Sequence, residues 1–149
     1  MSIVIRKAEE KDSPAINILF IEMLFSVYGT TDGSGYEEGY LERYFNNTGD
    51  MILLAEDGDI PVGFLSVQIH DGPPRYIYLD DFSVTEPYRG MGIGTAMMDR
   101  AEAYADKKGI SAIVLHVERS NHRATALYSR RGYRQYRDDG DRILLVKEI

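Results

Sequence analysis

A glycine-rich loop between an apolar stretch and an amphipathic stretch constrains the fold of this chain more than any other feature. Gly90, Gly92 and Gly94 stand at alternate positions, after residues 75–84 and at the start of an amphipathic stretch that ends at Lys107-Lys108-Gly109. The first stretch is expected to be a strand and the second a helix, because the apolar residues of the second recur at helical spacing. Main-chain N–H groups at a helix N-terminus bind anions, and glycines let a ligand approach the backbone closely. The pattern predicts an anion site suited to a pyrophosphate, with a tight turn that holds no ligand as the alternative.

Two other phosphate-binding loops do not fit this spacing. A Walker A loop ends in Gly-Lys-Ser/Thr, whereas Gly94 is followed directly by Thr95. A dinucleotide fingerprint needs G-x-G-x-x-G, whereas this chain has G-x-G-x-G. Glu118 stands near the place of the ribose-binding acid, but only 31 residues follow it, too few to complete a doubly wound sheet. Neither nucleotide fold is therefore predicted.

The rest of the chain alternates short apolar stretches with turn signals. Residues 112–118 are expected to form a buried strand after the helix, so that strand, loop, helix and strand make one parallel crossover. Further strands are expected at residues 3–5, 51–56, 62–70, 133–137 and 142–147, and further helices between Asp12 and Gly29, over 36–44 and over 121–131. The predicted order is β-α-α-β-β-β-α-β-α-β-β. This order indicates a mixed, mostly antiparallel α/β sheet flanked by helices, in one domain over residues 1–149.

Particular residues set the limits of the first two helices. Asp12 is expected to cap the first helix, with Pro14 in its first turn and Gly29 at its end. The apolar stripe of this helix consists of Ile16, Leu19, Phe20, Met23, Leu24 and Val27. The second, weaker helix is predicted from tyrosines four residues apart, which are Tyr36, Tyr40 and Tyr44, with Gly39 among them.

Composition argues against several classes of protein. The net charge of −7 supplies no basic surface, so a nucleic-acid partner is not predicted. No apolar run approaches the ~20 residues that cross a bilayer, and the N-terminus lacks the apolar core of a signal peptide. A cytoplasmic protein that does not enter the membrane is therefore expected. The chain has no cysteine and its three histidines are scattered, so neither a thiol nucleophile nor a metal site is predicted.

The glycine loop also matches the pattern Arg-x-x-Gly-x-Gly, from Arg89 to Gly94. With this motif the chain resembles the GNAT superfamily of acetyl-CoA-dependent N-acetyltransferases, over nearly its whole length. The other matching segments are residues 5–12, residues 82–90, and the last helix with its turn, at Asn121, Ala124, Tyr128 and Arg131-Gly132-Tyr133. Residues 79–84 look most similar to the diamine and polyamine acetyltransferase branch. The resemblance implies a GNAT-like α/β domain.

The resemblance implies acetyl-CoA as co-substrate and no metal. Main-chain N–H groups from Gly90 to Thr95 would hold the pyrophosphate. The pantetheine arm would pair like an extra strand with residues 82–84. One N–H of these residues would donate a hydrogen bond to the acetyl carbonyl oxygen. Tyr128 would be the partner of the leaving sulfur, with core packing as the alternative, and Asn121 a cofactor contact, with a helix N-cap as the alternative. The implied cofactor-binding residues are Phe82, Ser83, Val84, Arg89, Gly90, Met91, Gly92, Ile93, Gly94, Thr95, Asn121 and Tyr128.

An amine acceptor needs a base. A lysine-like amine with a pKa of ~10.4 is neutral in only roughly one molecule in two thousand at pH 7. The polyamine branch implies Asp80 as the catalytic base. Other branches place the base where this chain has Tyr78, and His116 and Glu118 are further candidates. Asp80 and Asp81 are adjacent in a strand, so their side chains are expected to point to opposite faces.

Asp80, Asp81 and Tyr36 are the predicted acceptor-binding residues, since carboxylates and aromatic faces suit a cation. The predicted acceptor is a small-molecule amine that carries positive charge, such as a diamine or polyamine. One alternative is a peptide or protein acetyltransferase that acts on an N-terminus or a lysine. Another is an acyl-CoA-binding module without catalysis. A homodimer is compatible with the resemblance, although no interface is legible in the sequence.

Overall fold

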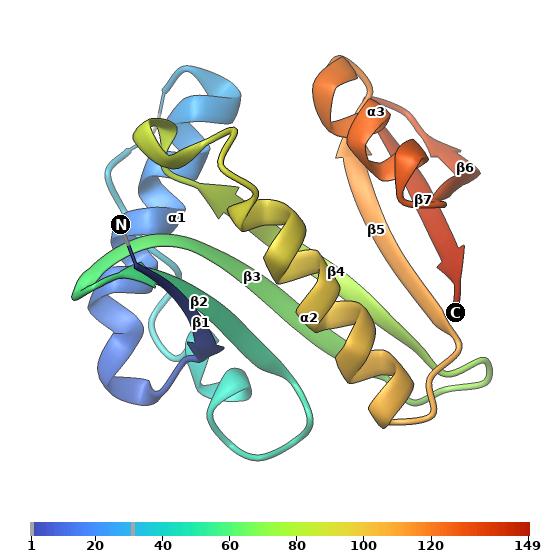
Figure 1. The fold of residues 1–149 in the computed structure, drawn as a ribbon, viewed down its shortest axis with the longest axis horizontal. Helices are drawn as coiled ribbons and strands as arrows, with labels where there is room; N and C mark the ends of the chain where they lie inside the picture. The colour runs from blue at the N-terminus through green and yellow to red at the C-terminus, as the bar shows by residue number, and fades with distance from the viewer. Residues whose placement is uncertain (1, 31) are drawn as a thin grey trace. The chain divides into compact units, whose positions relative to one another are not determined.

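A computed structural model describes residues 2–30 and 32–149 of the chain, and Figure 1 shows its ribbon. The strands in these residues are β1 (Ile3–Lys7), β2 (Met51–Asp57), β3 (Ile60–His70), β4 (Tyr76–Val84), β5 (Ala112–Glu118), β6 (Arg134–Asp139) and β7 (Arg142–Glu148). The α-helices are α1 (Ser13–Tyr28), α2 (Ile93–Lys107) and α3 (His122–Arg130). Short 3₁₀ turns are η1 (Glu10–Asp12), η2 (Tyr40–Tyr44) and η3 (Glu86–Tyr88).

The strands form one seven-stranded sheet in the order β1-β2-β3-β4-β5-β7-β6. Strands β4 and β5 are parallel, while β1 with β2, β2 with β3, β5 with β7 and β6 with β7 are antiparallel. A parallel pair needs a long crossover connection, which α2 supplies between β4 and β5. The predicted mixed, mostly antiparallel α/β sheet is therefore confirmed.

The chain divides into two compact units. The first comprises Met1–Val67 and Asp81–Arg100, and the second comprises Gln68–Asp80 and Ala101–Ile149. Strands β3 and β4 and helix α2 each contribute residues to both units. That residues 1–149 make a single domain stays a prediction.

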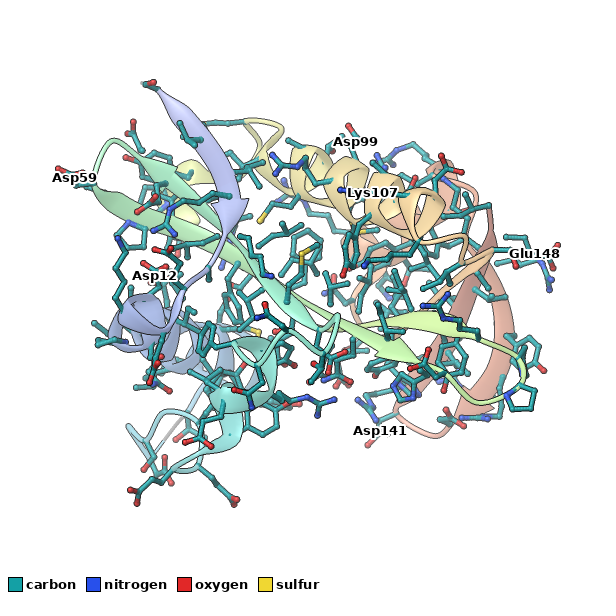
Figure 2. All side chains as sticks on the ribbon, turned by 90° about the horizontal axis from the view of Figure 1, so that it is seen from below. Asp12, Asp59, Asp99, Lys107, Asp141 and Glu148 are labelled. Atoms are coloured by element: carbon teal, nitrogen blue, oxygen red, sulfur yellow. The ribbon has the colours of Figure 1, made fainter. Side chains whose placement is uncertain are left out.

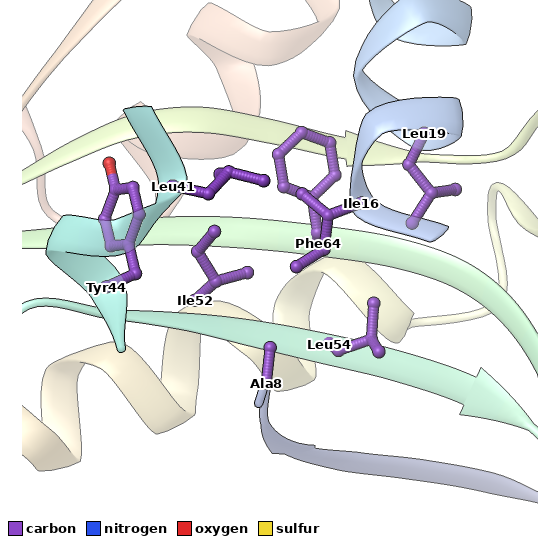
Figure 3. Packing of buried hydrophobic residues seen from close by; sticks show 8 residues of the cluster. All are labelled: Ala8, Ile16, Leu19, Leu41, Tyr44, Ile52, Leu54 and Phe64. Atoms are coloured by element: carbon purple, nitrogen blue, oxygen red, sulfur yellow. The ribbon is translucent and has the colours of Figure 1, made fainter. Parts of the chain in front are cut away.

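The first unit is built around a cluster of buried apolar side chains, which Figure 3 shows from close by. Ile52 and Leu54 stand at alternate positions of β2 and share one face of the sheet with Phe64 of β3. The whole cluster consists of Ala8, Ile16, Leu19, Leu41, Tyr44, Ile52, Leu54 and Phe64. Truncating a buried phenylalanine to alanine typically costs about 3–5 kcal/mol, so this cluster is a main source of stability for the unit.

Helix α1 ends where the sequence predicts. Gly29 has a left-handed φ of +73°, and its N–H donates to the Phe25 carbonyl oxygen at 2.8 Å. The apolar stripe is buried at Ile16 and Leu19, but Val27 is 50% exposed. Phe20 and Met23 pack against the core cluster while partly buried, so the predicted apolar stripe contacts the core along most of its length but not at Val27.

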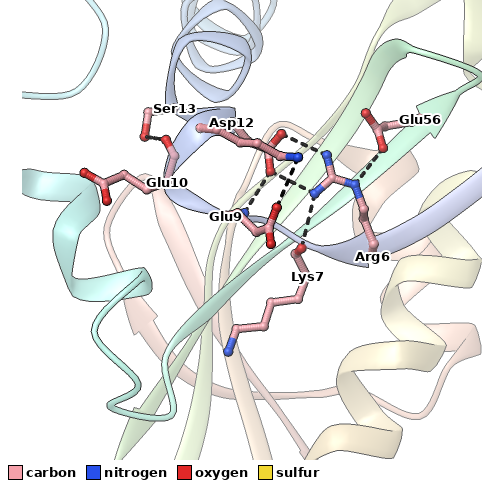
Figure 4. A network of polar contacts seen from close by, with 8 residues as sticks. Arg6, Lys7, Glu9, Glu10, Asp12, Ser13 and Glu56 are labelled. Carbon is pink, nitrogen blue, oxygen red and sulfur yellow. Dashed lines mark hydrogen bonds and ion pairs between the residues drawn. The ribbon is translucent and has the colours of Figure 1, made fainter.

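Asp12 stands directly before α1 but does not cap it (Figure 4). Its carboxylate accepts two hydrogen bonds of 2.8 Å from the Arg6 guanidinium and one of 2.8 Å from the Glu9 N–H. The Nε of Arg6 also donates to Glu56 at 2.7 Å. The predicted capping role is therefore wrong, because a cation from β1 and the N–H that precedes η1 bind the carboxylate. These contacts hold the pKa of Asp12 below its usual value, with the Arg6 hydrogen bonds as the largest cause.

The helix predicted for the three-tyrosine segment is also wrong. Gly39 has a left-handed φ of +83°, and only the short turn η2 follows it. Ring stacking orders this segment instead. Tyr36 lies on Phe20 with ring centroids 3.8 Å apart, and Tyr40 lies on Tyr36 at 4.9 Å. Tyr44 is buried in the core cluster. Tyrosines four residues apart are thus placed by aromatic contacts and not by a helical repeat.

The second unit combines an alternating strand with a partly buried charge cluster. The buried residues of β5 are Ile113, Leu115 and Val117. Glu102 of α2 accepts a hydrogen bond of 3.2 Å from the Tyr133 hydroxyl and forms ion pairs with Arg131 at 3.1 Å and Lys147 at 2.8 Å. One carboxylate therefore links α2 to the end of α3 and to β7 within this unit.

Exposed charged side chains surround both units. Figure 2 labels Asp59 and Asp99 of the first unit, and Lys107, Asp141 and Glu148 of the second, all of them exposed. Among residues 2–30 and 32–149, no helix has the length and apolar character that a bilayer span demands.

Candidate functional site

The glycine loop of the first unit forms the entry to α2. It leaves β4 through η3, and α2 begins at Ile93. Gly90 and Gly92 have left-handed φ values of +77° and +83°. A Cβ atom at either glycine would meet no other atom within 4 Å, so the space in front of both is open. Open backbone at the positive end of a helix dipole fits a pyrophosphate, as the sequence predicts.

Side chains of the first unit hold this loop in place. The Tyr88 hydroxyl donates to Asp57 at 2.7 Å. The Nε of Arg89 donates to the Val84 carbonyl oxygen at 2.8 Å, and its Nη2 donates to Ser26 Oγ at 3.3 Å. Arg89, which the sequence predicts to bind the cofactor, thus binds protein oxygens in this structure. Its guanidinium closes the loop back onto the end of β4.

The remaining loop residues differ in what they can offer a ligand. A Cβ atom at Gly94 would lie 3.3 Å from Cζ of Phe82, so this glycine makes room for a ring of its own unit. The Ile93 side chain is buried, which leaves only its main chain for a ligand. Met91 and Thr95 are exposed. The loop therefore combines inward packing at two positions with outward access at the others.

The end of β4 runs past its parallel partner pairs. The register of β4 with β5 consists of three residue pairs, of which the last joins Leu79 to Leu115. Residues 82–84 follow in β4, and beyond them the Thr85 N–H donates to the Val62 carbonyl oxygen at 2.8 Å. The three residues predicted to pair with a pantetheine arm therefore lie beyond the parallel pairs of this strand.

Two of the predicted acceptor residues come together in the first unit. The Tyr36 hydroxyl donates a hydrogen bond to Asp81 Oδ2. The Tyr36 ring also stacks with the rings of Phe20 and Tyr40. A carboxylate beside an aromatic stack can attract a cation, which agrees with the character predicted for these residues.

Asp80 belongs to the second unit and has different neighbours. Its side chain is exposed, and its Oδ2 accepts a long hydrogen bond of 3.4 Å from Nε2 of the buried Gln68. Adjacent strand residues point to opposite faces, which agrees with the separate partners of Asp80 and Asp81. The role of Asp80 as a base stays a prediction.

Tyr128 of α3 is a mostly buried residue. Its side chain is only 8% exposed, and its ring meets Tyr133 edge-on with centroids 5.8 Å apart. Among the residues that the structure describes, the hydroxyl has no hydrogen-bond partner. Burial raises the pKa of Tyr128 to about 12. Because no described protein group engages it, this hydroxyl is available for a ligand.

Asn121 acts as the N-cap of α3. Its Oδ1 accepts a hydrogen bond of 3.1 Å from the Ala124 N–H. The capping alternative considered from the sequence is therefore realised, which leaves the Nδ2 group of the side chain to meet a ligand.

A chain of polar side chains in the second unit joins three strands. The Tyr78 hydroxyl lies 2.6 Å from Nδ1 of His116, and Nε2 of His116 lies 2.8 Å from Oδ2 of Asp139. The Arg137 guanidinium donates to both oxygens of Asp139, at 2.7 and 3.1 Å. Tyr78 and His116 were among the candidate bases in the sequence, whereas Asp139 was missed. The only signal for Asp139 was its place in an acidic turn, which gives no hint of a partner 23 positions away.

Glu118, the remaining candidate base, ends β5 and is half-buried. Across the residues with a described position, no group of three or more His, Asp or Glu side chains is arranged to hold a metal ion.

Comparisons with known proteins find related sequences over most of the chain. A family model described as "Acetyltransferase (GNAT) family" matches residues 21–133. An uncharacterized N-acetyltransferase of Methanocaldococcus jannaschii is 30% identical over 153 residues, which cover 97% of this chain and 91% of the relative. N-alpha-acetyltransferase 50 of Danio rerio is 29% identical over 99 residues, which cover 63% of this chain and 59% of the relative. The chain spans only 47% to 62% of the length of three of the curated relatives it matches.

Solved structures share the fold over the whole chain. The PaiA N-acetyltransferase of Thermoplasma acidophilum, crystallised in complex with coenzyme A, superposes with a TM-score of 0.81 at 23% sequence identity. The match covers 100% of both chains. At this level of identity the likeness concerns the fold.

Proposed function

Because the chain belongs to the acetyltransferase (GNAT) family, we propose that it is an N-acetyltransferase that moves the acetyl group of acetyl-CoA to a primary amine. The observation that carries this proposal is the open backbone at Gly90 and Gly92, at the N-terminus of α2. Left-handed glycines with free space in front of them also stand in ordinary turns, as at Gly58 and Gly140, so it is the place of Gly90 and Gly92 at the N-terminus of α2 that points to an anion. A pyrophosphate would use that space and the N–H groups around it.

Acetyl-CoA would supply an acetyl thioester, and the chain would supply the groups that bind and activate it. The N–H groups from Gly90 to Thr95 would hold the pyrophosphate. Residues 82–84 would pair with the pantetheine arm, which is supported by their place beyond the last parallel pair of β4. An N–H there, aimed at the acetyl oxygen, would be worth about 2.7–4 kcal/mol to the transition state. Arg89 would keep the loop in shape.

Tyr128 would stabilise the leaving sulfur by hydrogen bonding. With a pKa of about 12, its proton is held more tightly than that of a free thiol, whose pKa is ~8.5. Handing the proton over fully would therefore cost roughly 5 kcal/mol. A neutral hydroxyl that donates to a thiolate avoids this cost. The absence of another partner among the described residues supports such a role.

We propose the Tyr78–His116 pair as the base, ahead of Asp80, and the hydrogen bond between its members supports this choice. Its hydrogen bond of 2.6 Å offers a direct route for a proton from the hydroxyl to the imidazole, whose side chain is 15% exposed. Asp80 remains the alternative, since it is exposed and lies two positions after Tyr78. Comparing His116→Gln with Asp80→Asn separates them. The variant that lacks the base should lose about 10²-fold in kcat/KM at pH 7, and less at pH 9, where more of the amine is already neutral.

A small cationic amine is the first candidate acceptor. The net charge of −7, the exposed Asp80 and the Tyr36–Asp81 pair support a diamine or polyamine. A peptide N-terminus is the second candidate, because the Danio rerio relative is an N-alpha-acetyltransferase. Incubation with acetyl-CoA and a panel of diamines, lysine analogues and short peptides, followed by free thiol, distinguishes them. If no amine of the panel causes thiol release, the remaining hypothesis is an acyl-CoA-binding module without catalysis.

The loop assignment has its own test. Gly92→Asn keeps a residue that tolerates left-handed φ but places a side chain in the open space, so acetyl-CoA binding measured by calorimetry should be lost. Gly58→Asn is the matched control, because Gly58 has a φ of +60°, equally open space and a place in the β2–β3 turn. If both variants bind like the wild type, the loop does not hold the cofactor.

A further inference from the structure

The polar chain of the second unit has a direction that follows from its distances and charges. Three strands each supply one member, with Tyr78 from β4, His116 from β5 and Asp139 from β6. The Tyr78 hydroxyl lies 2.6 Å from Nδ1 of His116, and Asp139 Oδ2 lies 2.8 Å from Nε2. Both nitrogens of one imidazole are therefore engaged. A neutral imidazole carries only one proton, so one of its nitrogens donates and the other accepts.

Asp139 decides which nitrogen carries the proton. Arg137 donates to both of its oxygens, and these bonds together with His116 hold the pKa of Asp139 at about 2. An ionised carboxylate only accepts hydrogen bonds, so Nε2 of His116 must donate to it. In the neutral ring Nδ1 then carries a lone pair, and the Tyr78 hydroxyl must be the donor toward it. The opposite tautomer would set a lone pair against the carboxylate.

We propose that Asp139 is a positioning residue that fixes His116 in its Nε2–H tautomer, so that Nδ1 can take the proton of the Tyr78 hydroxyl. The inference rests on the proposed acetyl transfer for its catalytic meaning. When an ammonium group gives a proton to Tyr78 Oη, the Tyr78 O–H proton would move to His116 Nδ1. One N–H bond of the ammonium breaks and one N–H bond of the imidazole forms. The products are a neutral amine and an imidazolium ion beside the Asp139 carboxylate.

Asp138 offers a matched control for Asp139. The two acids are adjacent in β6, but Asp138 pairs with Arg119 at 2.5 Å and accepts from the Gly140 N–H at 3.1 Å. Asp138→Asn thus removes a charge and an ion pair from the same hairpin without touching the imidazole. Asp139→Asn exchanges the pure acceptor for an amide that can donate to Nε2. The proton of His116 would then be free to sit on Nδ1, where it blocks transfer from Tyr78.

The test reads the tautomer and the turnover separately. Nitrogen-15 NMR of histidine-labelled protein should show His116 protonated at Nε2 in the wild type and in Asp138→Asn, and a gain of the Nδ1–H form in Asp139→Asn. Turnover of the best amine should fall about 10- to 100-fold in Asp139→Asn, by analogy with the loss of carboxylates that orient metal-binding histidines, with the KM for acetyl-CoA unchanged. Asp138→Asn should keep wild-type kcat.

Three results would overturn the inference. The first is a wild-type His116 protonated at Nδ1, which decides the matter even where Asp139→Asn fails to fold. The second is an Asp139→Asn variant that keeps the Nε2–H tautomer or the wild-type kcat. The third is an equal loss of kcat in both variants, which would indicate a structural role of the hairpin. A wild type without thiol release would refute the proposed function alone, because the tautomer is read without turnover.

Discussion

Replacing Tyr128 by phenylalanine removes one hydroxyl and leaves the ring that packs against Tyr133. The hydroxyl has no partner among the described residues, so its loss should change the free energy of unfolding by no more than about 0.5 kcal/mol. A hydrogen bond to a charged group is worth roughly 1.5–3 kcal/mol. At 1.36 kcal/mol per factor of ten, kcat should therefore fall about 10- to 150-fold. Acetyl-CoA affinity should stay unchanged, because the thiolate exists only late in the reaction.

The opposite pattern is expected for Tyr133→Phe, the facing ring. Its hydroxyl donates to the partly buried Glu102 at 3.2 Å, and removing a partner from such a group costs about 1–3 kcal/mol. At this chain length the melting temperature should fall by roughly 2–4 °C per kcal/mol, with kcat near the wild-type value. Two variants that each lack one hydroxyl on facing rings should thus separate catalysis from stability.

The assay is steady-state thiol release, with a pre-steady-state experiment to establish that the chemical step limits turnover. Because its pKa of about 12 keeps Tyr128 protonated below roughly pH 11, no loss of activity should arise from its deprotonation at pH 6–9. Wild-type kcat in Tyr128→Phe, under conditions where chemistry limits the rate, would reduce Tyr128 to a packing residue. A large drop in melting temperature would contradict the absence of a partner for the hydroxyl.

Three further predictions concern stability, loop packing and the acceptor. Asp12→Asn should lower the free energy of unfolding by about 2 kcal/mol at pH 7 in urea titrations, since Arg6 loses its charged acceptor. Because Arg6 depresses the pKa of Asp12 in the folded state, this difference should be complete above about pH 5 and vanish as pH falls through the folded pKa; a difference that persists in acid would contradict the assignment. Gly94→Ala should not gain the roughly 1 kcal/mol that alanine normally adds over glycine within a helix, because the new methyl group would lie 3.3 Å from the Phe82 ring, and a variant stabilised by that full amount would refute the contact. For a diamine acceptor, kcat/KM should fall as salt is raised from 0.1 to 1 M, since the Debye length shrinks from about 10 Å to 3 Å, and a salt-independent value would argue against a cationic acceptor.

The glycine loop and the strands around it could be predicted from the sequence because their signals are local. Gly90 and Gly92 do adopt left-handed φ, and α2 begins at Ile93, directly after them. The hairpin turn at Gly58 and the end of α1 at Gly29 also follow from residues that favour such backbone. In each case the backbone conformation depends on residues within a few positions of one another, so it can be recognised in the sequence.

Where a prediction from local sequence was wrong, a side chain outside the local pattern contacts the residue concerned. The Asp12 carboxylate binds the Arg6 guanidinium and the Glu9 N–H in the capping box of η1, and it does not bind the first N–H groups of α1. The three-tyrosine segment follows the ring of Phe20 on α1 in place of a helical repeat. In both cases a contact formed in the folded chain outweighs the short-range preference on which the prediction was based.

The sequence by itself determined the crossover through the glycine loop, the mixed sheet and the resemblance that pointed to acetyl transfer, because these depend on backbone preferences and ordered motifs. Only the tertiary structure decided which side chains act together. Tyr78 and His116 are 38 positions apart, and His116 and Asp139 are 23 positions apart, so no spacing rule links them. They meet because β4 pairs with β5, β5 with β7 and β7 with β6, and that order is set by sheet packing far beyond the reach of any local preference.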